Sequence, residues 1–505
     1  MGFRVISLDA LDVSNRNATV LATGKRVESV LASLGIDDNS KQVARAMLAA
    51  KEKCFTLYRT GAEKDSSGAD VVWRLSVVVL GEQKSRHMPL QDVFGARKAL
   101  NAKSFAKDGA FVVALDDDSV EAYEGVVAAI LRSKPTYSRK TEKKDGEFDA
   151  CDGDNAIAIA DDLDEASMRR LGAIAEIVPM VAHWVDMPTL ELDTEEFAQI
   201  ARKEAEKLGI RVEEIRGDDL LSRGFGGLYH VGKSGTAAPC LVSLEYRAAK
   251  ARRRIALVGK GLVYDTGGLC LKPREHMSTM KGDMGGAAAV LGAVLLAAKT
   301  GLDCDVTGIL CMAENGIGPN ALRPDDVITL HSGLTVEINN TDAEGRLILC
   351  DALTYAEGRL VLGDGVSYAS SHYSPDLIVD VATLTGAQLM CTGKRHAGLL
   401  ARSEELESAI VEASRACGEP VFPMLYATDM LIEEFKSDVA DMKNSCKDRM
   451  NAQSSCAGHF VEKHLAKEYR GEYAHIDIAG PAWDGERATG YGAVLLDAIC
   501  RLAKA

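Results

Sequence analysis

Short apolar segments alternate with helical segments along most of this 505-residue chain, and this alternation limits the fold more than any other feature. Residues 72–80, 255–258 and 377–382 have the length and composition of strands. Residues 119–131 and 284–299 have the periodicity or the apolar character of helices. Such alternation is typical of α/β proteins, in which helices cover the faces of a mostly parallel sheet. We therefore predict an α/β fold with a central, mostly parallel sheet.

The length of the chain predicts two or more domains, because a domain usually holds roughly 100 to 200 residues. Residues 133–155 are polar and charged, which indicates an exposed loop near a domain boundary. A long helix is expected after this loop, with Pro188 just beyond its end. We predict a smaller N-terminal α/β domain at residues 1–160, a connecting helix at 161–186 and a larger α/β domain at 187–505.

The overall composition excludes several classes of protein. Hydrophobic residues make up 47% of the chain and charged residues 26%, as in ordinary globular proteins, so disordered and fibrous classes have no support. The net charge of -15 would repel nucleic-acid phosphates and anionic lipids, and no stripe of Lys and Arg offsets it locally. We expect neither nucleic acid nor a membrane as a partner.

Targeting signals and cysteine spacing bear on the location of the protein. Residues 1–5 lack the basic region and following apolar stretch of a secretory signal. The longest apolar run, 284–298, is shorter than the roughly 18 residues of a membrane span. The twelve cysteines form no C-x-x-C pair, and we expect them to be reduced. A cytoplasmic location is expected.

Charged residues follow two of the strand-like segments. One apolar segment runs into Lys260, with Asp265 and Lys272 further along the chain. Another, 336–338, runs into the octapeptide 340–347, which reads Asn-Thr-Asp-Ala-Glu-Gly-Arg-Leu. Open α/β sheets bind their ligands beyond the carboxyl ends of their strands. The functional site is therefore expected around these charges.

Four carboxylates belong to this candidate site: Asp265, Asp283, Asp342 and Glu344. Four negative charges in one cleft require compensation, and two divalent cations would supply it. Carboxylate-rich sites suit Mn²⁺, Mg²⁺ or Zn²⁺, and two metal ions about 3.5 to 4 Å apart can share a bridging hydroxide nucleophile. The sequence therefore favours a two-metal site.

The octapeptide itself is expected to begin as extended chain and to lead into a helix. In an extended segment the two-residue period would direct Asp342, Glu344 and Arg346 toward one face. A helix over 347–357 would then place its positive end beside Arg346. That position suits an anion.

These residues resemble the leucyl aminopeptidases, the M17 family of metallopeptidases. The octapeptide matches the family signature, and the resemblance is closest from Val258 to Leu384. It extends more weakly from Trp184 to the segment His475–Gly480. The resemblance implies an aminopeptidase that releases N-terminal residues, preferably leucine-like, from peptides.

The resemblance also implies how the metal ions are held. Asp265 and Glu344 would bridge the two ions, and Asp342 would complete the more exchangeable site. Asp283 and the neutral amine of Lys260 would complete the tighter one, which requires the metal to displace a proton from the lysine. Zn²⁺ or Mn²⁺ is expected, with Mg²⁺ or Co²⁺ as alternatives, and a hydroxide that bridges the ions would be the nucleophile.

Further roles follow from the same resemblance. Lys272 would hold the scissile carbonyl oxygen as it becomes an oxyanion. Arg346, together with Leu384, would hold a bicarbonate ion that serves as the general base. A homohexamer is expected, with active sites that face an interior cavity. The apolar pocket for the first side chain would be formed by Met280, Thr383 and Gly386.

Simpler interpretations exist for each residue taken alone. Asp283 could cap a helix, Asp342 could form a turn, and Lys260 and Arg346 could be solvated surface charges. Their combination with the octapeptide favours the metal site. Three rival functions stay open: a dipeptidase of the cysteinylglycine type, a metal-dependent phosphate-transfer enzyme, and a non-enzymatic scaffold or nucleic-acid regulator.

Two other segments are interpreted as connections. Residues 227–234 match the P-loop pattern G-x-x-x-x-G-K-[ST], but the flanking sequence does not provide the required strand before it and helix after it. Residues 358–375 look like an insertion of about a dozen residues, a length that a surface loop tolerates. We expect this insertion to lie near the pocket or a subunit contact.

Overall fold

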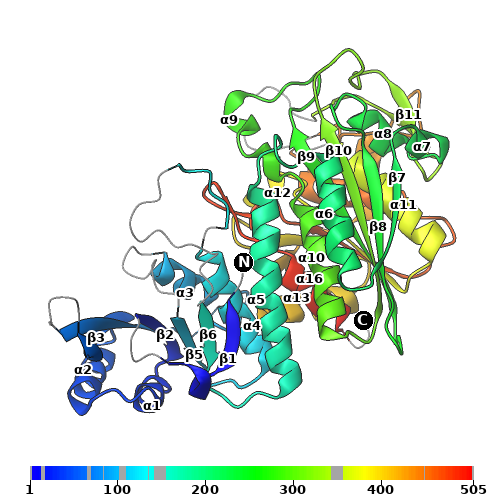
Figure 1. Cartoon of the computed structure of the whole chain (residues 1–505). Coiled ribbons are helices and arrows are strands. Elements are labelled where there is room, and N and C mark those ends of the chain that lie inside the picture. The colour runs from blue at the N-terminus through cyan, green and yellow to red at the C-terminus, as the bar shows by residue number, and fades with distance from the viewer. Residues whose placement is uncertain are drawn as a thin grey trace. The chain divides into compact units, whose positions relative to one another are not determined.

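The computed structural model describes residues 3–12, 17–64, 70–82, 85–101, 110–134, 136–141, 155–342, 357–448 and 450–502. The chain divides into two compact units (Figure 1). The first consists of Met1–Met180 with Ser414–Glu419, and the second of Val181–Ala413 with Pro420–Ala505. Each unit has its own sheet, which confirms the α/β fold with a smaller and a larger part. The domain boundaries at residues 160 and 186 stay predictions.

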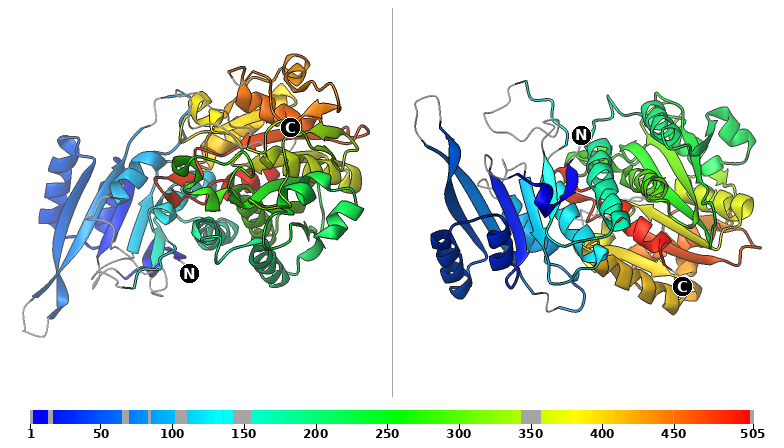
Figure 2. Two further views of the ribbon diagram at one scale, coloured as in Figure 1. Left: turned by 90° about the horizontal axis from the view of Figure 1, so that it is seen from above. Right: turned by 60° about the horizontal axis from the view of Figure 1, so that its bottom comes forward.

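A six-stranded sheet in the order β1-β6-β5-β2-β4-β3 forms the first unit (Figure 2). Neighbouring strands are parallel except β3 and β4. All five residues of β5 are buried, as expected for a central parallel strand. The strands are β1 (Arg4–Ser7), β2 (Ala18–Thr23), β3 (Cys54–Lys64), β4 (Asp70–Leu80), β5 (Ala110–Ala114) and β6 (Ala156–Ile159). The helices are η1 (Leu8–Ala10), α1 (Val27–Ser33), α2 (Asp38–Ala49), α3 (Val93–Leu100), α4 (Val120–Arg132) and the first part of α5 (Glu165–Asp186).

The second unit contains an eight-stranded sheet in the order β15-β14-β17-β13-β9-β10-β8-β7. Its centre, β17-β13-β9-β10, is parallel, and antiparallel pairs flank it on both sides. The carboxyl ends of the four central strands therefore share one edge, where a ligand site is expected. The strands are β7 (Arg211–Arg216), β8 (Cys240–Tyr246), β9 (Arg254–Asp265), β10 (Asp305–Asn315), β13 (Leu377–Ala382), β14 (Ala397–Ala401), β15 (Val421–Pro423) and β17 (Glu472–Asp477).

Helices cover both faces of this sheet. Helix α10 (Gly285–Thr300) packs on β9, β10 and β13 and against α16 (Ala493–Cys500), whereas α8 (Gly226–Gly232), α11 (Glu357–Tyr368) and α15 (Gln453–Glu462) join the core of the other face. The segment Arg274–Thr300 is long and apolar enough to cross a membrane, but 94% of its most apolar window is buried. It therefore belongs to the core of this unit.

The remaining elements of the second unit are shorter. Two small sheets consist of β11 (Val327–Thr329), β12 (Thr335–Glu337) and β16 (Met442–Lys443), and of β18 (Trp483–Asp484) and β19 (Arg487–Ala488). The other helices are α6 (Thr194–Glu206), α7 (Asp218–Ser222), α9 (Arg274–Met277), η2 (Met280–Gly282), η3 (Ala369–Tyr373), α12 (Ala387–Cys391), α13 (Glu404–Ala416), α14 (Thr428–Leu431) and η4 (Ile432–Phe435).

Two strand expectations need correction. The strand predicted at 255–258 continues to Asp265, because β9 stays paired with β10 along its whole length, whereas its pairing with β13 stops at Gly259. The backbone pairing with β10 thus outweighs the weak strand preference of Gly259 and Gly261, and Lys260 lies within the strand. The segment 336–338 lies in the small sheet with β11 and β16, outside the central sheet.

The expectation of a surface loop at 358–375 is wrong. Helix α11 and the π-helical turn η3 fill this segment, and Leu360, Val361 and Val366 are buried. A side chain at Gly365 would collide with Cys311, so glycine allows the helix to pack closely on the sheet. Residues 226–232 form helix α8 where a phosphate-binding loop would need irregular chain, which agrees with the rejection of a P-loop.

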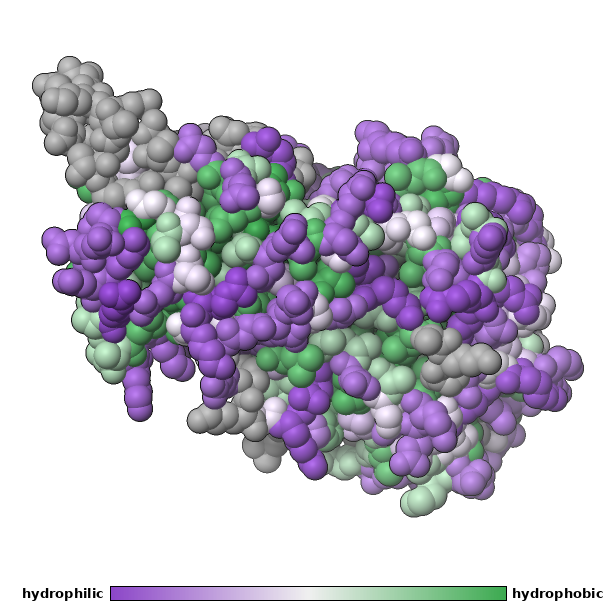
Figure 3. Space-filling model, turned by 90° about the horizontal axis from the view of Figure 1, so that it is seen from below, coloured by the Kyte–Doolittle hydropathy of each residue, from purple (hydrophilic) through white to green (hydrophobic). Residues whose placement is uncertain are grey.

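The surface matches the charged composition of the chain. On the face in Figure 3, hydrophilic side chains cover most of the visible surface, and hydrophobic ones lie between them. Apolar residues on the surface of a globular protein are normal when they are dispersed in this way.

Candidate active site

The first group of buried charges lies around Lys260 in β9. Its Nζ atom donates to Asp283 Oδ1 at 2.6 Å and to the carbonyl oxygen of Thr383 at 2.8 Å. The hydroxyl of Thr383 donates to the same oxygen of Asp283 at 2.8 Å. All three residues are buried. Strand β9, the turn before α10 and the end of β13 therefore meet at one point.

Two glycines allow these segments to approach one another. A β carbon at Gly286 would lie 2.2 Å from the carbonyl oxygen of Val381, and one at Gly259 would lie 2.6 Å from the Cα atom of Ala287. Any side chain at either position would push α10 away from β9 and β13. These two glycines, one in β9 and one at the start of α10, thus allow the carboxylate of Asp283 to reach the strand.

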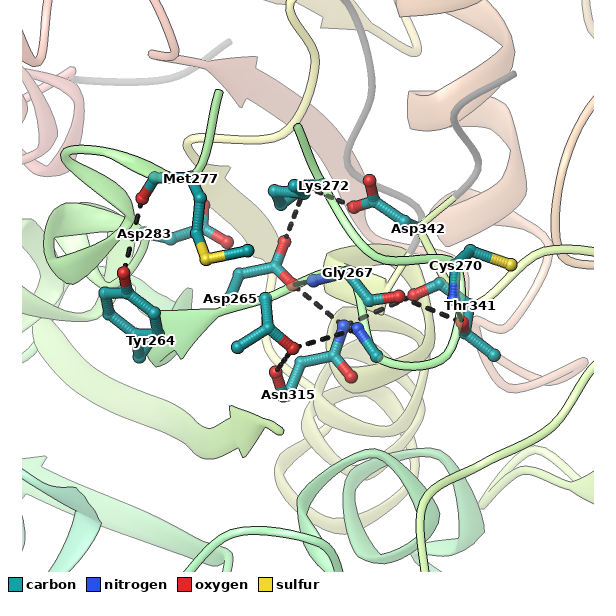
Figure 4. Close-up of polar contacts among 12 residues, drawn as sticks. Tyr264, Asp265, Gly267, Cys270, Lys272, Met277, Asp283, Asn315, Thr341 and Asp342 are labelled. Atoms are coloured by element: carbon teal, nitrogen blue, oxygen red, sulfur yellow. Dashed lines mark hydrogen bonds and ion pairs between the residues drawn. The ribbon is translucent and has the colours of Figure 1, made fainter. Parts of the chain in front are cut away.

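Lys272 connects two further carboxylates (Figure 4). Its Nζ atom lies 3.1 Å from Asp265 Oδ2 and contacts Asp342 Oδ1. The other oxygen of Asp265 accepts hydrogen bonds from the backbone N–H of Gly267 at 2.9 Å and from Nδ2 of Asn315 at 2.8 Å. Strand β9 and the start of the octapeptide are therefore joined through buried charges.

The start of the octapeptide packs against the turn that follows β9. The hydroxyl of Thr341 donates to the carbonyl oxygen of Gly267 at 2.9 Å and accepts from the N–H of Cys270 at 2.8 Å. Gly267 has a φ of 82°, and a β carbon there would lie 2.7 Å from Cγ of Asp342. Only glycine combines this backbone conformation with the close approach.

The buried charges of the described residues do not balance. Within this part of the chain, three carboxylates, from Asp265, Asp283 and Asp342, face two amines, from Lys260 and Lys272, which leaves one excess negative charge when all are ionised. Burial alone would raise the pKa of Asp265, but the charges of Lys272 and Lys260 outweigh it and lower the pKa. Burial raises the pKa of Asp283 to about 7 despite the neighbouring Lys260. Of these two carboxylates, Asp283 is thus the one that lacks compensation.

The donor set fits divalent cations. Oδ2 of Asp283 is buried and has no hydrogen-bond partner among the residues that the structure describes. Carboxylate oxygens suit Mn²⁺ and Mg²⁺ and are accepted by Zn²⁺, and a cation would neutralise the excess charge. Within the described ranges, no three His, Cys, Asp or Glu side chains form a ready metal cluster, and the two lysines hold the carboxylates instead.

Comparison with known proteins identifies the family. The Peptidase_M17 model, which describes the catalytic domain of the cytosol aminopeptidase family, matches residues 180–357 and 354–496. Together these ranges span more than half of the chain. The chain belongs to the M17 cytosol aminopeptidase family. Members of this family act on peptides and typically bind two divalent metal ions.

Individual relatives agree with this assignment. Probable aminopeptidase NPEPL1 of Homo sapiens is 46% identical over 379 residues, 74% of this chain and 69% of the human protein. Leucine aminopeptidase 1 of Caenorhabditis elegans is 39% identical over 408 residues, 81% of this chain and 79% of the relative. The structure of leucyl aminopeptidase from Trypanosoma brucei in complex with bestatin matches with a TM-score of 0.86 and 33% identity, over 99% of this chain and 96% of that one.

The other residues that the M17 resemblance singled out lie at two places. Met280 and Thr383 are both buried. Met280 lies three residues before Asp283 in the sequence, and Thr383 donates a hydrogen bond to Asp283. Gly386 precedes α12. Leu384 directly follows Thr383. Glu344, Arg346 and residues 347–356 of the helix predicted over 347–357 lie outside the described residues, and residue 357 begins α11.

Asn315 is a functional candidate that the sequence analysis missed. It ends β10, is buried, and donates from Nδ2 both to Asp265 at 2.8 Å and to the carbonyl oxygen of Thr341 at 3.2 Å. One side chain therefore ties a predicted metal ligand to the octapeptide. Its position at the end of an apolar strand, the signal used for Asp265, could have revealed it.

Asp477 is a second missed candidate, at the end of β17. Its carboxylate accepts from the N–H of Leu384 at 3.1 Å, the hydroxyl of Thr385 at 2.6 Å and the N–H of Ala479 at 3.1 Å. These bonds hold the turn that carries Thr383. Asp477 belongs to the segment His475–Gly480, where the family resemblance was weaker, so its role was not visible from the sequence.

Proposed function

We propose that this protein is a two-metal aminopeptidase that releases N-terminal residues, preferably leucine-like, from peptides. The observation that carries the proposal is the excess of buried carboxylate among the described residues at the carboxyl edge of the central sheet, where Oδ2 of Asp283 has no hydrogen-bond partner within that part of the chain. A structural cluster of ion pairs has no need of a surplus charge, whereas a cation site does.

The metal ions would be held by residues from three parts of the chain. Lys260 and Asp283 would serve one site, Asp342 the other, and Asp265 with Glu344 would bridge them. Two divalent ions, Zn²⁺ or Mn²⁺ with Mg²⁺ or Co²⁺ as alternatives, would supply Lewis-acid activation of water and of the scissile carbonyl. To act as a ligand, Lys260 must lose its proton and give up its bond to Asp283.

The remaining side chains would bind and orient the substrate. Lys272, released from Asp342 when a cation takes its place, would hold the carbonyl oxygen as negative charge develops on it. Arg346 and Leu384 would hold a bicarbonate ion that accepts the proton of the attacking water. The free α-amine of the peptide would bind at the metal site, which would restrict cleavage to the first residue.

The leucine preference rests on an apolar pocket. Met280 and Thr383 are buried beside Asp283, and Gly386, which has no side chain, precedes α12. A branched apolar side chain would bury its surface there. We also propose a cytoplasmic homohexamer, which light scattering of the purified protein would test by its mass.

Metal removal and replacement is the direct test. The protein is stripped with a chelator, each of Zn²⁺, Mn²⁺, Co²⁺ and Mg²⁺ is added back alone, and hydrolysis of Leu-amide is followed. Activity should disappear on metal removal and return with at least one ion. A control variant in which Glu206, an exposed residue of α6, is replaced by Ala should show the same loss and recovery. Activity that survives thorough removal of metal contradicts the proposal. Faster hydrolysis of Cys-Gly than of Leu-amide would favour the dipeptidase alternative.

A further inference from the structure

Asn444 is a buried polar residue at the end of a short strand. It directly follows β16 and is completely buried. Strand β16 runs parallel to β12, with Lys443 opposite Glu337. The N–H of Asn444 donates to the carbonyl oxygen of Glu337 at 3.1 Å, which is the last backbone hydrogen bond that the structure describes between the two segments. The backbones separate after this point, just before the octapeptide begins.

Beyond β12, the side chain of Asn444 takes the place of a strand partner. Its Oδ1 atom accepts from the N–H of Asn339 at 3.0 Å, and its Nδ2 atom donates to the carbonyl oxygen of Asn340 at 2.8 Å. A side-chain amide carries both a donor and an acceptor, as a peptide group does, so it can bind both groups at once. Buried backbone groups need such partners, because a missing one costs free energy. Asn444 thus fixes the path of the chain at the start of the octapeptide.

The fixed backbone leads directly to Asp342. The side-chain Oδ1 atom of Asn340 accepts from the N–H of Asp342 at 2.8 Å. Between them, the carbonyl oxygen of Thr341 accepts from Nδ2 of Asn315 at 3.2 Å. The hydrogen bonds that place the buried carboxylate of Asp342 therefore begin at Asn444 on one side and at Asn315 on the other.

Asn444 is itself held by a buried charge. The Nη1 atom of Arg359 donates to the backbone carbonyl oxygen of Asn444 at 3.3 Å. Arg359 lies at the start of α11 and is completely buried. Hydrogen bonds from a charged donor are stronger than those between neutral groups. Because α11 packs on β9 and α15, Asn444 is anchored to the core of the second unit.

This support comes from elements that differ from those around Asp283. Lys260, Asp283 and Thr383 are joined by their own hydrogen bonds and belong to β9, the turn before α10 and the end of β13. The support of Asp342 comes instead from the small sheet of β12 and β16. Loss of the Asn444 side chain should therefore displace Asp342 more than Asp283.

We propose that Asn444 is a positioning residue that holds Asp342 for one of the two metal ions, the one in the more exchangeable site. This inference rests on the proposed two-metal function. Asn444 acts through the backbone from which the carboxylate extends, without being a ligand itself. Asn444→Ala would remove both bonds to the chain. Asn444→Asp would keep the shape and the acceptor, but would place a charged oxygen against the carbonyl oxygen of Asn340.

Hydrogen–deuterium exchange of the metal-free, full-length protein tests this geometry without reference to metal or activity. In Asn444→Ala, amides of the segment 339–342 should exchange roughly tenfold faster, because the loss of one or two hydrogen bonds has effects of this size. Strand β13 should exchange as in the parent. Unchanged exchange at 339–342, or faster exchange in both segments, overturns the proposal.

Titration with Mn²⁺ tests the link to one metal ion. Calorimetry of the metal-free parent should show two bound ions. Both Asn444 variants should bind the tighter ion like the parent and the second ion roughly 10 to 100-fold more weakly. Equal weakening of both ions, or no change, overturns the proposal. Asn451→Ala removes an exposed amide, which bonds to Glu434 at 2.7 Å, and is the matched control that should bind both ions like the parent.

Excess metal separates a positioning residue from a ligand. At limiting Mn²⁺ the Asn444 variants should hydrolyse Leu-amide more slowly, and at saturating Mn²⁺ their kcat should return to within about threefold of the parent, since Asp342 is still present. Asp342→Ala should not recover. Failure of the Asn444 variants to recover overturns the assigned role. A parent that binds no Mn²⁺ contradicts the two-metal function itself, and the exchange experiment still decides whether Asn444 fixes the segment.

Discussion

The Nζ atom of Lys260 lies 2.6 Å from Oδ1 of Asp283, and neither side chain exposes more than 1% of its surface to solvent. The pair joins the middle of β9 to the turn before α10. In the absence of a metal ion, each group supplies the opposite charge that the other needs. Their interaction therefore has consequences for both stability and metal binding.

Replacement of Lys260 by Met should destabilise the metal-free protein. Removal of the amine leaves the buried carboxyl of Asp283 without its compensating charge, which costs about 3 kcal/mol in the free energy of unfolding. Urea denaturation in the presence of a chelator measures this change. The double variant Lys260→Met/Asp283→Leu should recover most of the loss, and equal stability of the single variant and the parent would contradict the pairing.

Asp265 and Lys272, which contact each other, should differ in the effect of their substitution. Asp265→Ala should abolish metal-supported turnover, because a proposed metal ligand is removed. Lys272→Ala should keep its metal and lower kcat by about 10² to 10³, the usual effect of removing an oxyanion donor. Metal content by elemental analysis, measured beside Leu-amide kinetics, separates the two. Loss of metal from the Lys272 variant would mean that its assigned role is wrong.

Asn315→Ala should weaken metal binding although Asn315 is not a predicted ligand. Its side chain orients Asp265 and the backbone of Thr341, and loss of such support typically costs about 10 to 100-fold in metal affinity or activity. Competition with a chromogenic chelator gives the affinity. Asn320→Ala, at an exposed position nearby in sequence, is the matched control and should bind like the parent. Identical affinities of both variants would count against the role of Asn315.

Asp477→Ala should raise KM for Leu-amide more than it lowers kcat. The carboxylate holds the turn of Leu384 and Thr385, which carries the proposed pocket residue Thr383, so its removal loosens substrate binding. An effect of roughly tenfold is expected, with Asp477→Asn in between because its amide oxygen can still accept one bond. Steady-state kinetics decide; an unchanged KM in the Ala variant would show that the turn holds without Asp477.

Acid should destabilise the protein through His464. Burial lowers the pKa of His464 to about 3 from its ordinary value of 6.5. Between these values the unfolded chain binds a proton that the folded protein does not, so stability falls as the pH drops below about 6.5, by up to roughly 1.4 kcal/mol per pH unit. His464→Gln, which can still meet the hydroxyl of Ser332, should reduce this slope. Denaturation curves at several pH values, compared between variant and parent, test it.

Much of the fold could be predicted because it depends on local patterns. The apolar runs that became β4 and β13, and the helical segments that became α4 and α10, lie close to where the sequence indicated them. The prediction of a loop at 358–375 was wrong because the glycines and polar residues of this segment resemble a loop when they are considered alone. Packing against Val258 and Cys311 makes it a buried helix, and only the sheet provides those neighbours.

The site divides in the same way. The sequence alone predicted which carboxylates and lysines form the site, because the octapeptide and its neighbours resemble those of the M17 family, and it predicted that their negative charge requires cations. The tertiary structure decided how they pair, Lys260 with Asp283 and Lys272 with Asp265 and Asp342, and added Asn315, Asn444 and Asp477 as supports. These contacts join residues far apart along the chain, so they depend on strand register and on the close approach at Gly259 and Gly286, which no local pattern contains.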